Sequence, residues 1–286
     1  METNSISIGV STGAQEFDNL SPSETYTGSF DIINTSSIDS IAYKIIIAPY
    51  SVNDISYDAN FSDRDDYNQI VDWIKLEDTS GELNENERKK INFKIEVPEN
   101  APAGGQYASF LVQIVNREGE KNELSLSSKS QVASLVYATV AGETIETADI
   151  LENNINIINI DRPVSFSSMV ENTGNVHLSA AYNFRIYSLF SNEEIFSNED
   201  TPAVSTLLPE TIYYTEKKWE ETPKLGIFRV VQEISVADSL ETFSSSERIV
   251  FVCPSWFLIL CSLFIFSMIF WFILRIRERK YNIKLA

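Results

Sequence analysis

The sequence has 286 residues, with 22 Lys and Arg against 41 Asp and Glu, so its formal net charge at pH 7 is −19. A charge of this size repels phosphate backbones and anionic lipid, which excludes nucleic acid as a favourable partner and leaves cationic segments, neutral glycans or proteins. The chain outside its C-terminal apolar run is long enough for two domains of ordinary size.

The first part of the chain, residues 1–142, is predicted to be an all-β domain. Residues 26–32 and 91–97 alternate apolar and polar side chains, which places one set on a buried sheet face and the other in water. Turn sequences such as SPSE, NTSS and PENAPAGG separate short strands, as is typical of β-sandwiches. We expect an immunoglobulin-like sandwich.

Residues 53–76 interrupt this alternation. An acidic stretch leads into DDYNQIVDWIKL, where apolar residues from Tyr67 to Ile74 recur at helical spacing and Asp66 with Gln69 suits a reciprocal helix cap. The sequence therefore predicts an insertion made of an acidic surface loop and one short amphipathic helix.

This insertion is the predicted binding region, because loops held on a rigid sandwich commonly carry binding. Tyr50, Tyr57 and Phe61 are expected to be exposed, and aromatic rings stack on sugars and anchor protein interfaces. For the apolar stripe of the helix, packing on the sheet is favoured over binding. Trp73 lies off that stripe. The candidate ligand-binding residues are Tyr57, Phe61, Tyr67 and Trp73.

The segment DANFSD, residues 58–63, begins like a calcium loop. It departs from the pattern at Asp63, where the sharp turn requires Gly, and at Gln69, which supplies no bidentate carboxylate. A solvated acidic loop is favoured over a calcium site, and the sequence predicts neither a metal nor a cofactor.

Residues 143–248 are predicted to form a second sandwich, since residues 178–186 alternate in the same way. The two halves also repeat an order of turns and strands, in which Asn34 corresponds to Asn172 and Tyr107 to Phe228. The boundary is expected near residues 141–149, and a Ser-rich stalk, SLETFSSSE, is expected to follow the second sandwich.

Residues 249–274 contain no charged residue and are long enough to cross a bilayer as a helix, which favours a span over a buried helix of a soluble core. Residues 275–286 hold five Lys or Arg and one Glu, so we expect this tail in the cytoplasm and the acidic domains outside. Both cysteines, Cys253 and Cys261, fall in the predicted span. The candidate anchor residues are Trp256, Trp271, Arg275, Arg277, Arg279 and Lys280.

An exported domain needs a targeting segment, and METNSISIGV has neither a basic start nor an apolar run of signal length. We therefore expect that a signal peptide preceded this sequence in the precursor.

Catalysis is disfavoured by the residue inventory. His177 is the only histidine and stands between a turn and a strand, where a surface or strand-edge position is expected. The sequence has no phosphate cradle, no HExxH and no G-x-S-x-G. A carboxylate pair could still cleave glycosides, but small sandwiches usually lack the cleft that this requires. The sequence predicts a protein that is not an enzyme.

The segments NLSPSETYTGSFDIINTSS, DYNQIVDWIKL, ENERKKINFKIEVP and PAGGQYASFLVQI resemble the peptidoglycan-binding domain of bacterial WxL-interacting surface proteins. Those proteins consist of an export signal, that domain, a second immunoglobulin-like domain, one C-terminal span and a basic tail. The resemblance implies attachment to cell-wall glycan and to partner surface proteins. Residues 256–258 read WFL, but they fall in the predicted span and are interpreted as anchor residues.

We therefore expect an all-β chain of two tandem immunoglobulin-like β-sandwiches followed by one transmembrane α-helix, held in the plasma membrane with its domains outside. Its expected function is non-catalytic binding of cell-wall glycan or another surface protein. The alternative is a membrane-tethered assembly chaperone or accessory subunit that lends a strand edge to a client by β-augmentation. A carboxylate-dependent glycosidase is the least favoured alternative.

Overall fold

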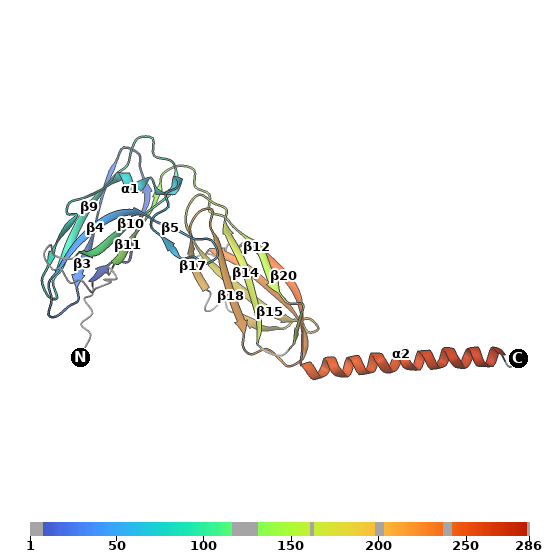
Figure 1. The fold of residues 1–286 in the computed structure, drawn as a ribbon. Coiled ribbons are helices and arrows are strands. Elements are labelled where there is room, and N and C mark those ends of the chain that lie inside the picture. The colour runs from blue at the N-terminus through green and yellow to red at the C-terminus, as the bar shows by residue number, and fades with distance from the viewer. Residues whose placement is uncertain (1–7, 116–130, 161–162, 198–202, 237–241, 285–286) are drawn as a thin grey trace. The chain divides into compact units, whose positions relative to one another are not determined.

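The computed structural model describes residues 8–115, 131–160, 163–197, 203–236 and 242–284. Most of these residues lie in β-strands, and the chain ends in one long helix, α2 (Ser255–Lys284) (Figure 1). A mostly-β fold with one C-terminal apolar helix is therefore confirmed.

The chain divides into two compact units that are interleaved in sequence. The first unit comprises Met1–Ala148, Glu171–Leu178 and Thr206–Tyr213, and the second comprises Asp149–Val170, Ser179–Ser205 and Tyr214–Ala286. Two short segments from the second half of the sequence thus belong to the first unit, and one of them, Thr206–Tyr213, lines its candidate site.

The first unit has two main sheets. One has the order β1 (Ile8–Ser11), β3 (Thr25–Asn34), β9 (Arg88–Glu96), β7 (Ile74–Leu76). The other has the order β2 (Ala14–Leu20), β11 (Gln131–Val140), β10 (Gly104–Val115), β4 (Ile41–Pro49), β8 (Ser80–Leu83). Immunoglobulin-type sandwiches pair their strands in this order.

The core of the first unit lies between these two sheets. Phe30 on β3 stacks on Phe110 of β10 with ring centroids 4.7 Å apart, and Phe93 on β9 lies 4.8 Å from the same ring. The alternation in β9 is the one that the sequence predicts: Ile91, Phe93 and Ile95 are buried while the intervening residues are exposed. Burial of such side chains contributes about 1.5–3 kcal/mol each.

The insertion is more strand-like than the sequence predicts. It contains the two-stranded hairpin of β5 (Ser51–Val52) and β6 (Ala59–Asn60), the 3-10 helix η1 (Asp66–Asn68) and the single-turn helix α1 (Ile70–Trp73). The predicted helix to Ile74 is wrong, because Ile74 begins β7 and pairs with Ile95 of β9. The reciprocal cap exists but starts one residue earlier, at Asp65 with Asn68.

The second unit repeats the two-sheet plan. One sheet has the order β12 (Ala148–Ile155), β14 (Val164–Asn172), β18 (Ile212–Trp219). The other has the order β13 (Ile158–Ile160), β20 (Thr242–Cys253), β19 (Gly226–Val236), β15 (Leu178–Ser188), β16 (Glu194–Ser197), with β17 (Ala203–Leu207) also paired to β15. Phe166 of β14 meets Phe184 of β15 edge-on at 4.6 Å, so the two sheets pack face to face.

The repeat predicted from the sequence is visible at Asn34, the last residue of β3. This side chain is fully buried, and its amide nitrogen donates to the carbonyl oxygens of Asp39 and Asn84, each at 2.8 Å. Its amide oxygen accepts from the backbone N–H of Ser36 at 3.0 Å. One side chain therefore holds the turn after β3 and the loop before β9.

Asn172, the last residue of β14, makes the same set of bonds. It is fully buried, and its amide nitrogen donates to the carbonyl oxygens of Val176 and Leu207, each at 2.9 Å. Its amide oxygen accepts from the backbone N–H of Gly174, also at 2.9 Å. Asn172 thereby fixes the two short segments that belong to the first unit.

The predicted equivalence of Tyr107 and Phe228 is also seen in how their rings pack. Each ring folds back over a glycine two residues earlier on its own strand, Gly105 in β10 and Gly226 in β19. A Cβ atom at Gly105 would lie 2.1 Å from the Tyr107 hydroxyl oxygen, and one at Gly226 would lie 2.3 Å from the Phe228 ring. A side chain at either glycine would collide with the ring.

The apolar helix starts later than the sequence predicts. Residues 249–253 complete β20, and Val250, Val252 and Cys253 are buried. Residues 242–247 of the predicted stalk are also in β20, while residues 239–241 lie outside the described part. Strand β20 is therefore joined to α2 through Pro254 alone, and Cys253 is a sandwich residue rather than a membrane residue. An uncharged buried strand end cannot be told from the start of a span by hydropathy.

Candidate functional site

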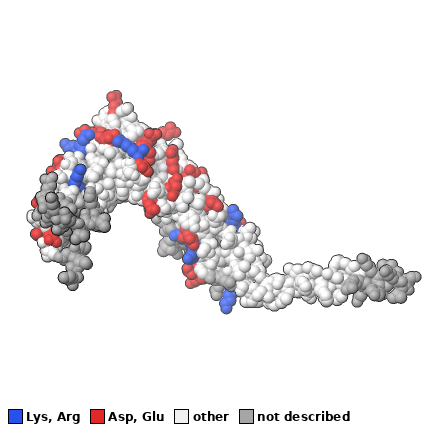
Figure 2. Space-filling view, viewed as in Figure 1, with Lys and Arg blue, Asp and Glu red and all other residues white. Residues whose placement is uncertain are grey.

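The first unit carries an open cleft of about 460 Å³ in which the insertion meets the Thr206–Tyr213 segment. We call it the acidic cleft. Asp and Glu outnumber Lys and Arg on the face shown in Figure 2. The carboxylates that line the cleft are Asp54, Asp63, Asp65, Asp66 and Glu210, and its neutral polar lining residues are Ser51, Asn53, Asn60 and Thr211. Val52, Tyr67 and Pro209 complete the lining.

Backbone pairing holds one wall of the cleft to the other. The N–H of Ile55 donates to the carbonyl oxygen of Ile212 at 2.8 Å, and the N–H of Ile212 donates to Oδ1 of Asp54 at 2.9 Å. Ile55 also forms an isolated parallel bridge with Tyr213. The hairpin of β5 and β6 is therefore fixed against the Thr206–Tyr213 segment.

Tyr57, one of the predicted binding residues, stabilises this junction. Its hydroxyl oxygen accepts from the backbone N–H of Leu208 at 2.8 Å and lies 3.1 Å from the Thr211 hydroxyl. Its ring meets the Tyr213 ring edge-on at 5.1 Å. Burial raises the pKa of Tyr57 above its usual 10.0. The residue is half-buried and is not part of the cleft lining.

Tyr67, which the sequence also predicts as a binding residue, lies in the cleft lining. Its hydroxyl donates to Oε1 of Glu210 at 3.1 Å. Burial, followed by the hydrogen bond to Glu210, raises the pKa of Tyr67 to about 12. The phenol therefore stays protonated at neutral pH and holds the Glu210 carboxylate in the cleft.

The carboxyl group of Asp65 lies in an environment that disfavours its negative charge. It caps η1 by accepting from the backbone N–H of Tyr67 at 2.8 Å. Burial raises the pKa of the Asp65 carboxyl above its usual 3.8, and the neighbouring charges of Asp66 and Glu210 raise it further. The hydrogen bond from Tyr67 opposes these effects without cancelling them. A cation placed in the cleft would relieve this repulsion.

The aromatic residues that precede η1 are less exposed than the sequence predicts. Tyr50 is only 9% exposed and packs in a small core with Tyr107 and Leu208. Phe61 is partly buried against the same core, with its ring centroid 6.0 Å from that of Tyr50. The expectation of a freely exposed Tyr50 is therefore wrong, since the hairpin folds back over it.

Trp73 is a core residue. Its side chain is 7% exposed and belongs to the main cluster of the first unit, with Ile70, Ile74 and Phe93. Its predicted exposure depended on a helix long enough to have a polar face, and α1 is a single turn. The structure brings Tyr57, Phe61 and Tyr67 to one region and places Trp73 inside the sandwich.

The other wall of the acidic cleft was not predicted. Glu210 bonds to Tyr67 across 143 residues of sequence, and Thr211 lies within hydrogen-bond distance of Tyr57 across 154 residues. Pro209 lines the cleft beside them. In the sequence they read only as a turn, LLPET. No group of three or more His, Cys, Asp or Glu among the described residues is arranged to hold a metal ion.

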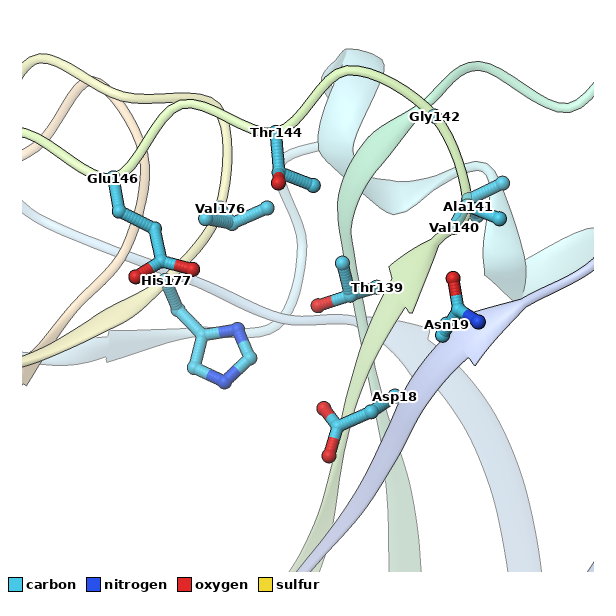
Figure 3. Close-up of a pocket in the computed structure, with 10 residues that line it drawn as sticks. All are labelled: Asp18, Asn19, Thr139, Val140, Ala141, Gly142, Thr144, Glu146, Val176 and His177. Carbon is cyan, nitrogen blue, oxygen red and sulfur yellow. The ribbon is translucent and has the colours of Figure 1, made fainter.

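A second pocket of the first unit, of about 350 Å³, surrounds His177 (Figure 3). The backbone N–H of His177 donates to the Tyr107 hydroxyl at 2.7 Å, and its Nε2 lies 3.1 Å from Oε1 of Glu16. Its ring also packs 5.1 Å from the Tyr137 ring. In Figure 3 the His177 ring and the Asp18 carboxylate face the same open space from different elements. His177 directly precedes β15, as predicted. Its side chain is only 10% exposed and is therefore largely covered.

The predicted anchor residues all lie in α2. Its segment Ser255–Ile276, of 22 residues, is long and apolar enough to cross a membrane. Trp256 and Trp271 are 58% and 57% exposed. The Arg275 guanidinium lies 4.9 Å from the centroid of the Trp271 ring. Arg277, Arg279 and Lys280 follow in the same helix.

No protein-family model and no curated protein matches the sequence. Solved structures with a similar arrangement of strands include a chaperone–tip adhesin complex of CFA/I fimbriae biogenesis, with 10% identity, a TM-score of 0.42, and coverage of 87% of this chain and 100% of that chain. The class 5 fimbriae chaperone CfaA gives 12% identity, a TM-score of 0.41, and coverage of 85% and 99%. A complex of the Salmonella enterica SafA pilin with the SafB chaperone gives 10% identity, a TM-score of 0.41, and coverage of 88% and 98%. Likeness at this level is weak and says nothing about the function of this chain.

Proposed function

We propose that this chain is a non-catalytic accessory subunit of a surface complex, tethered by α2 in a membrane, and that its acidic cleft binds a basic segment of another surface protein. The observation that carries the proposal is the charge of the cleft. Five carboxylates line it, and none of the described residues that line it is Lys or Arg. Charge complementarity of this kind selects a cationic partner and accelerates its association.

The tether follows from the way the second unit ends. Strand β20 leads into α2 through one residue, and the apolar part of α2 is not covered by the rest of the molecule. An uncovered apolar helix of 22 residues is unfavourable in water and has the length that a bilayer requires. The proposal therefore places two immunoglobulin-like domains outside the plasma membrane and the basic end of α2 in the cytoplasm.

Binding through the cleft suits the first unit better than lending a strand edge. Three of its edge strands, β1, β7 and β8, have four, three and four residues, and the fourth edge strand, β2, pairs in parallel with β11. Strand β2 also carries Glu16, Asp18 and a positive-φ Asn19, and its register shifts at the end. Short, charged and irregular edges discourage strand addition.

The resemblance to WxL-interacting surface proteins gives a specific form of this proposal, in which the partner is a WxL-bearing surface protein. Co-purification of the full chain from its native membrane tests it. Recovery of such a protein in a fixed ratio supports the resemblance, and its absence from the purified complex contradicts that form of the proposal.

Cell-wall glycan is the second candidate ligand. The neutral groups of the cleft, Ser51, Asn53, Asn60 and Thr211, can exchange hydrogen bonds with sugar hydroxyls. Salt distinguishes the two ligands, because attraction between exposed charges is screened within about 8 Å at physiological ionic strength. Binding of a basic peptide should weaken steeply as salt rises, whereas binding of a neutral glycan should change little.

Calorimetric titration of the full chain in nanodiscs tests the charge argument with two probes, a synthetic Lys- and Arg-rich peptide and purified peptidoglycan fragments. Asp63→Asn with Asp66→Asn removes two exposed charges from the cleft, and we expect a loss of peptide affinity of about tenfold or more. Glu85→Gln with Glu99→Gln removes two exposed charges elsewhere and serves as the matched control. Equal losses of peptide affinity in both double variants would show that only the net charge of the protein matters. That result would contradict specific binding in the cleft.

A further inference from the structure

The end of the second unit from which α2 leaves is defined by strand register. Cys253, the last residue of β20, lies opposite Ile160 of β13, and Val252 lies opposite Gly226 at the start of β19. The end of β15 reaches the same edge, since Ser188 pairs with Phe228. The turn after β15, the turn before β19 and the end of β13 therefore all lie at this end.

The helix begins at the same place. Only Pro254 separates β20 from α2, the N–H of Phe257 donates to the Pro254 carbonyl oxygen at 2.9 Å, and the Phe257 ring lies 6.3 Å from that of Phe251 on β20. With no linker between them, the edge of the sandwich that faces α2 lies within a few residues of the point where the chain would enter a bilayer.

Four large apolar side chains at this end are exposed. Phe190, in the turn after β15, is 84% exposed, and Leu225, in the turn before β19, is 47% exposed. Ile158 and Ile160, on one face of β13, are 56% and 53% exposed. Single exposed apolar residues are ordinary, but a gathering of them from three separate segments marks a contact surface.

We propose that Phe190, Leu225, Ile158 and Ile160 form a lipid-contacting surface that inserts into the headgroup region of the bilayer and seats the second unit on the membrane. The inference rests on the proposed function, because it requires α2 to span. Its occupant is lipid, since the surface is continuous with the start of the only apolar helix described.

The contact is apolar rather than electrostatic. Exposed Lys218 and Lys224 near this end are accompanied by exposed Glu220 and Glu221, so the charges of the adjoining turn balance. Partial insertion of aromatic and aliphatic side chains at the interface scales with the apolar area that leaves water. Seating should therefore occur on neutral phosphatidylcholine and should not require anionic lipid.

Tryptophan quenching in nanodiscs made with brominated phosphatidylcholine tests this in the full chain. The substitutions Phe190→Trp and Leu225→Trp place a reporter on the surface, and Leu151→Trp is the matched control. Leu151 is 51% exposed and lies on β12, where Ile150 bonds to Ser244 near the start of β20. That point is about 30 Å along β20 from Cys253 at roughly 3.3 Å per residue.

We expect the added tryptophan at positions 190 and 225 to lose a large part of its emission in brominated lipid, because interfacial rings sit at the headgroup level, and the one at 151 to lose almost none. The parent protein reports on α2 through Trp271. Quenching of the parent with no added quenching at 190 or at 225 would overturn the lipid-contacting surface and leave the tether intact. No quenching of the parent would show that α2 is outside the bilayer and would overturn the tether itself.

The thermal stability of each variant shows whether the substitution disturbs folding. All three positions are exposed, so the thermal unfolding of the second unit should stay within experimental error of the parent. Replacement of Phe190 and Leu225 together by Ser should also leave folding unchanged. That double variant should remove the restriction on rotation of the sandwich, measured by anisotropy decay, and an unchanged decay would contradict the proposal.

Discussion

At the scale of single residues, Asn34 and Asn172 show how one polar side chain can organise a loop. Each is fully buried, donates to at least two carbonyl groups and accepts from one N–H. The sequence predicts that the two are equivalent, because each follows an alternating strand and begins an Asn-containing turn. It does not reveal their distant partners, Asn84 and Leu207, which lie 50 and 35 residues away in the sequence.

The equivalence gives a paired prediction. Asn34→Ala and Asn172→Ala should each lower the free energy of unfolding by about 1–3 kcal/mol, because each leaves buried backbone groups without partners. Chemical denaturation of the full chain measures the effect. Asn92→Ala, which loses an exposed bond to Glu77, is the control and should change stability by less than about 0.5 kcal/mol. A neutral result at either buried position would contradict the shared role.

Trp73 gives a second prediction at this scale. Because its ring is in the core, Trp73→Ala should destabilise the first unit by about 3–5 kcal/mol, and any loss of binding should follow the loss of folded protein. Trp73→Phe keeps most of the buried area and should cost less. Thermal melting of the two variants checks this order. A Trp73→Ala variant that melts like the parent would show that Trp73 is a surface residue.

The raised pKa of Tyr67 has a consequence for stability at high pH. An unfolded tyrosine ionises near pH 10.0, whereas burial and the bond to Glu210 raise the pKa of Tyr67 to about 12. The folded state then holds the proton more tightly, so its contribution is complete below pH 10 and is lost as the pH rises toward 12. Across this pH range the free energy of unfolding should fall less steeply for Tyr67→Phe than for the parent. Tyr214→Phe, at an exposed tyrosine, is the control. An unchanged slope would show that the pKa of Tyr67 is not raised in the folded protein.

At the scale of secondary structure, strands were more predictable than the insertion. In β9 a strict period of two places Ile91, Phe93 and Ile95 inside, and the sequence alone predicts this. The apolar residues from Tyr67 to Ile74 fit a helix equally well, but they divide among η1, α1 and β7. Short apolar runs satisfy either period, and here pairing with β9 decides between them.

Only one side of the acidic cleft can be predicted from the sequence. Tyr57, Phe61 and Tyr67 occur together in the sequence, so their grouping needs no tertiary information. Glu210 joins them only because Asn172 and the Ile55 bridge bring its segment to the first unit. A single sequence contains no signal for such a long-range pairing.

The assignment of residues 249–253 to β20 leads to a prediction for that element. Val252→Asp places a charge in the core of the second unit, which should cost several kcal/mol and leave its sandwich sensitive to protease. Membrane association should persist, because the apolar part of α2 begins at Ser255. Ser245→Asp, exposed on the same strand, is the control. Loss of membrane association with an intact sandwich would instead place Val252 in the bilayer.

At the scale of the whole molecule, topology is the main prediction. Protease added to intact cells should remove both units, because the proposed orientation keeps the basic end of α2 in the cytoplasm. Changing Arg275, Arg277, Arg279 and Lys280 to Gln should produce a fraction of molecules with the opposite orientation. Protection of both units until lysis would reverse the assignment.

The single-residue junction at Pro254 also has a mechanical consequence. Strand β20 is hydrogen-bonded on both sides, to antiparallel β19 and parallel β13, and it continues into α2 without slack. Tension between a partner bound outside and an anchored α2 would run along β20. A strand loaded along its length shares the force among all its hydrogen bonds instead of opening them one after another. The last strand of the second unit is therefore placed to bear load, and the force needed to extract the chain should be set by shearing β20 from its neighbours.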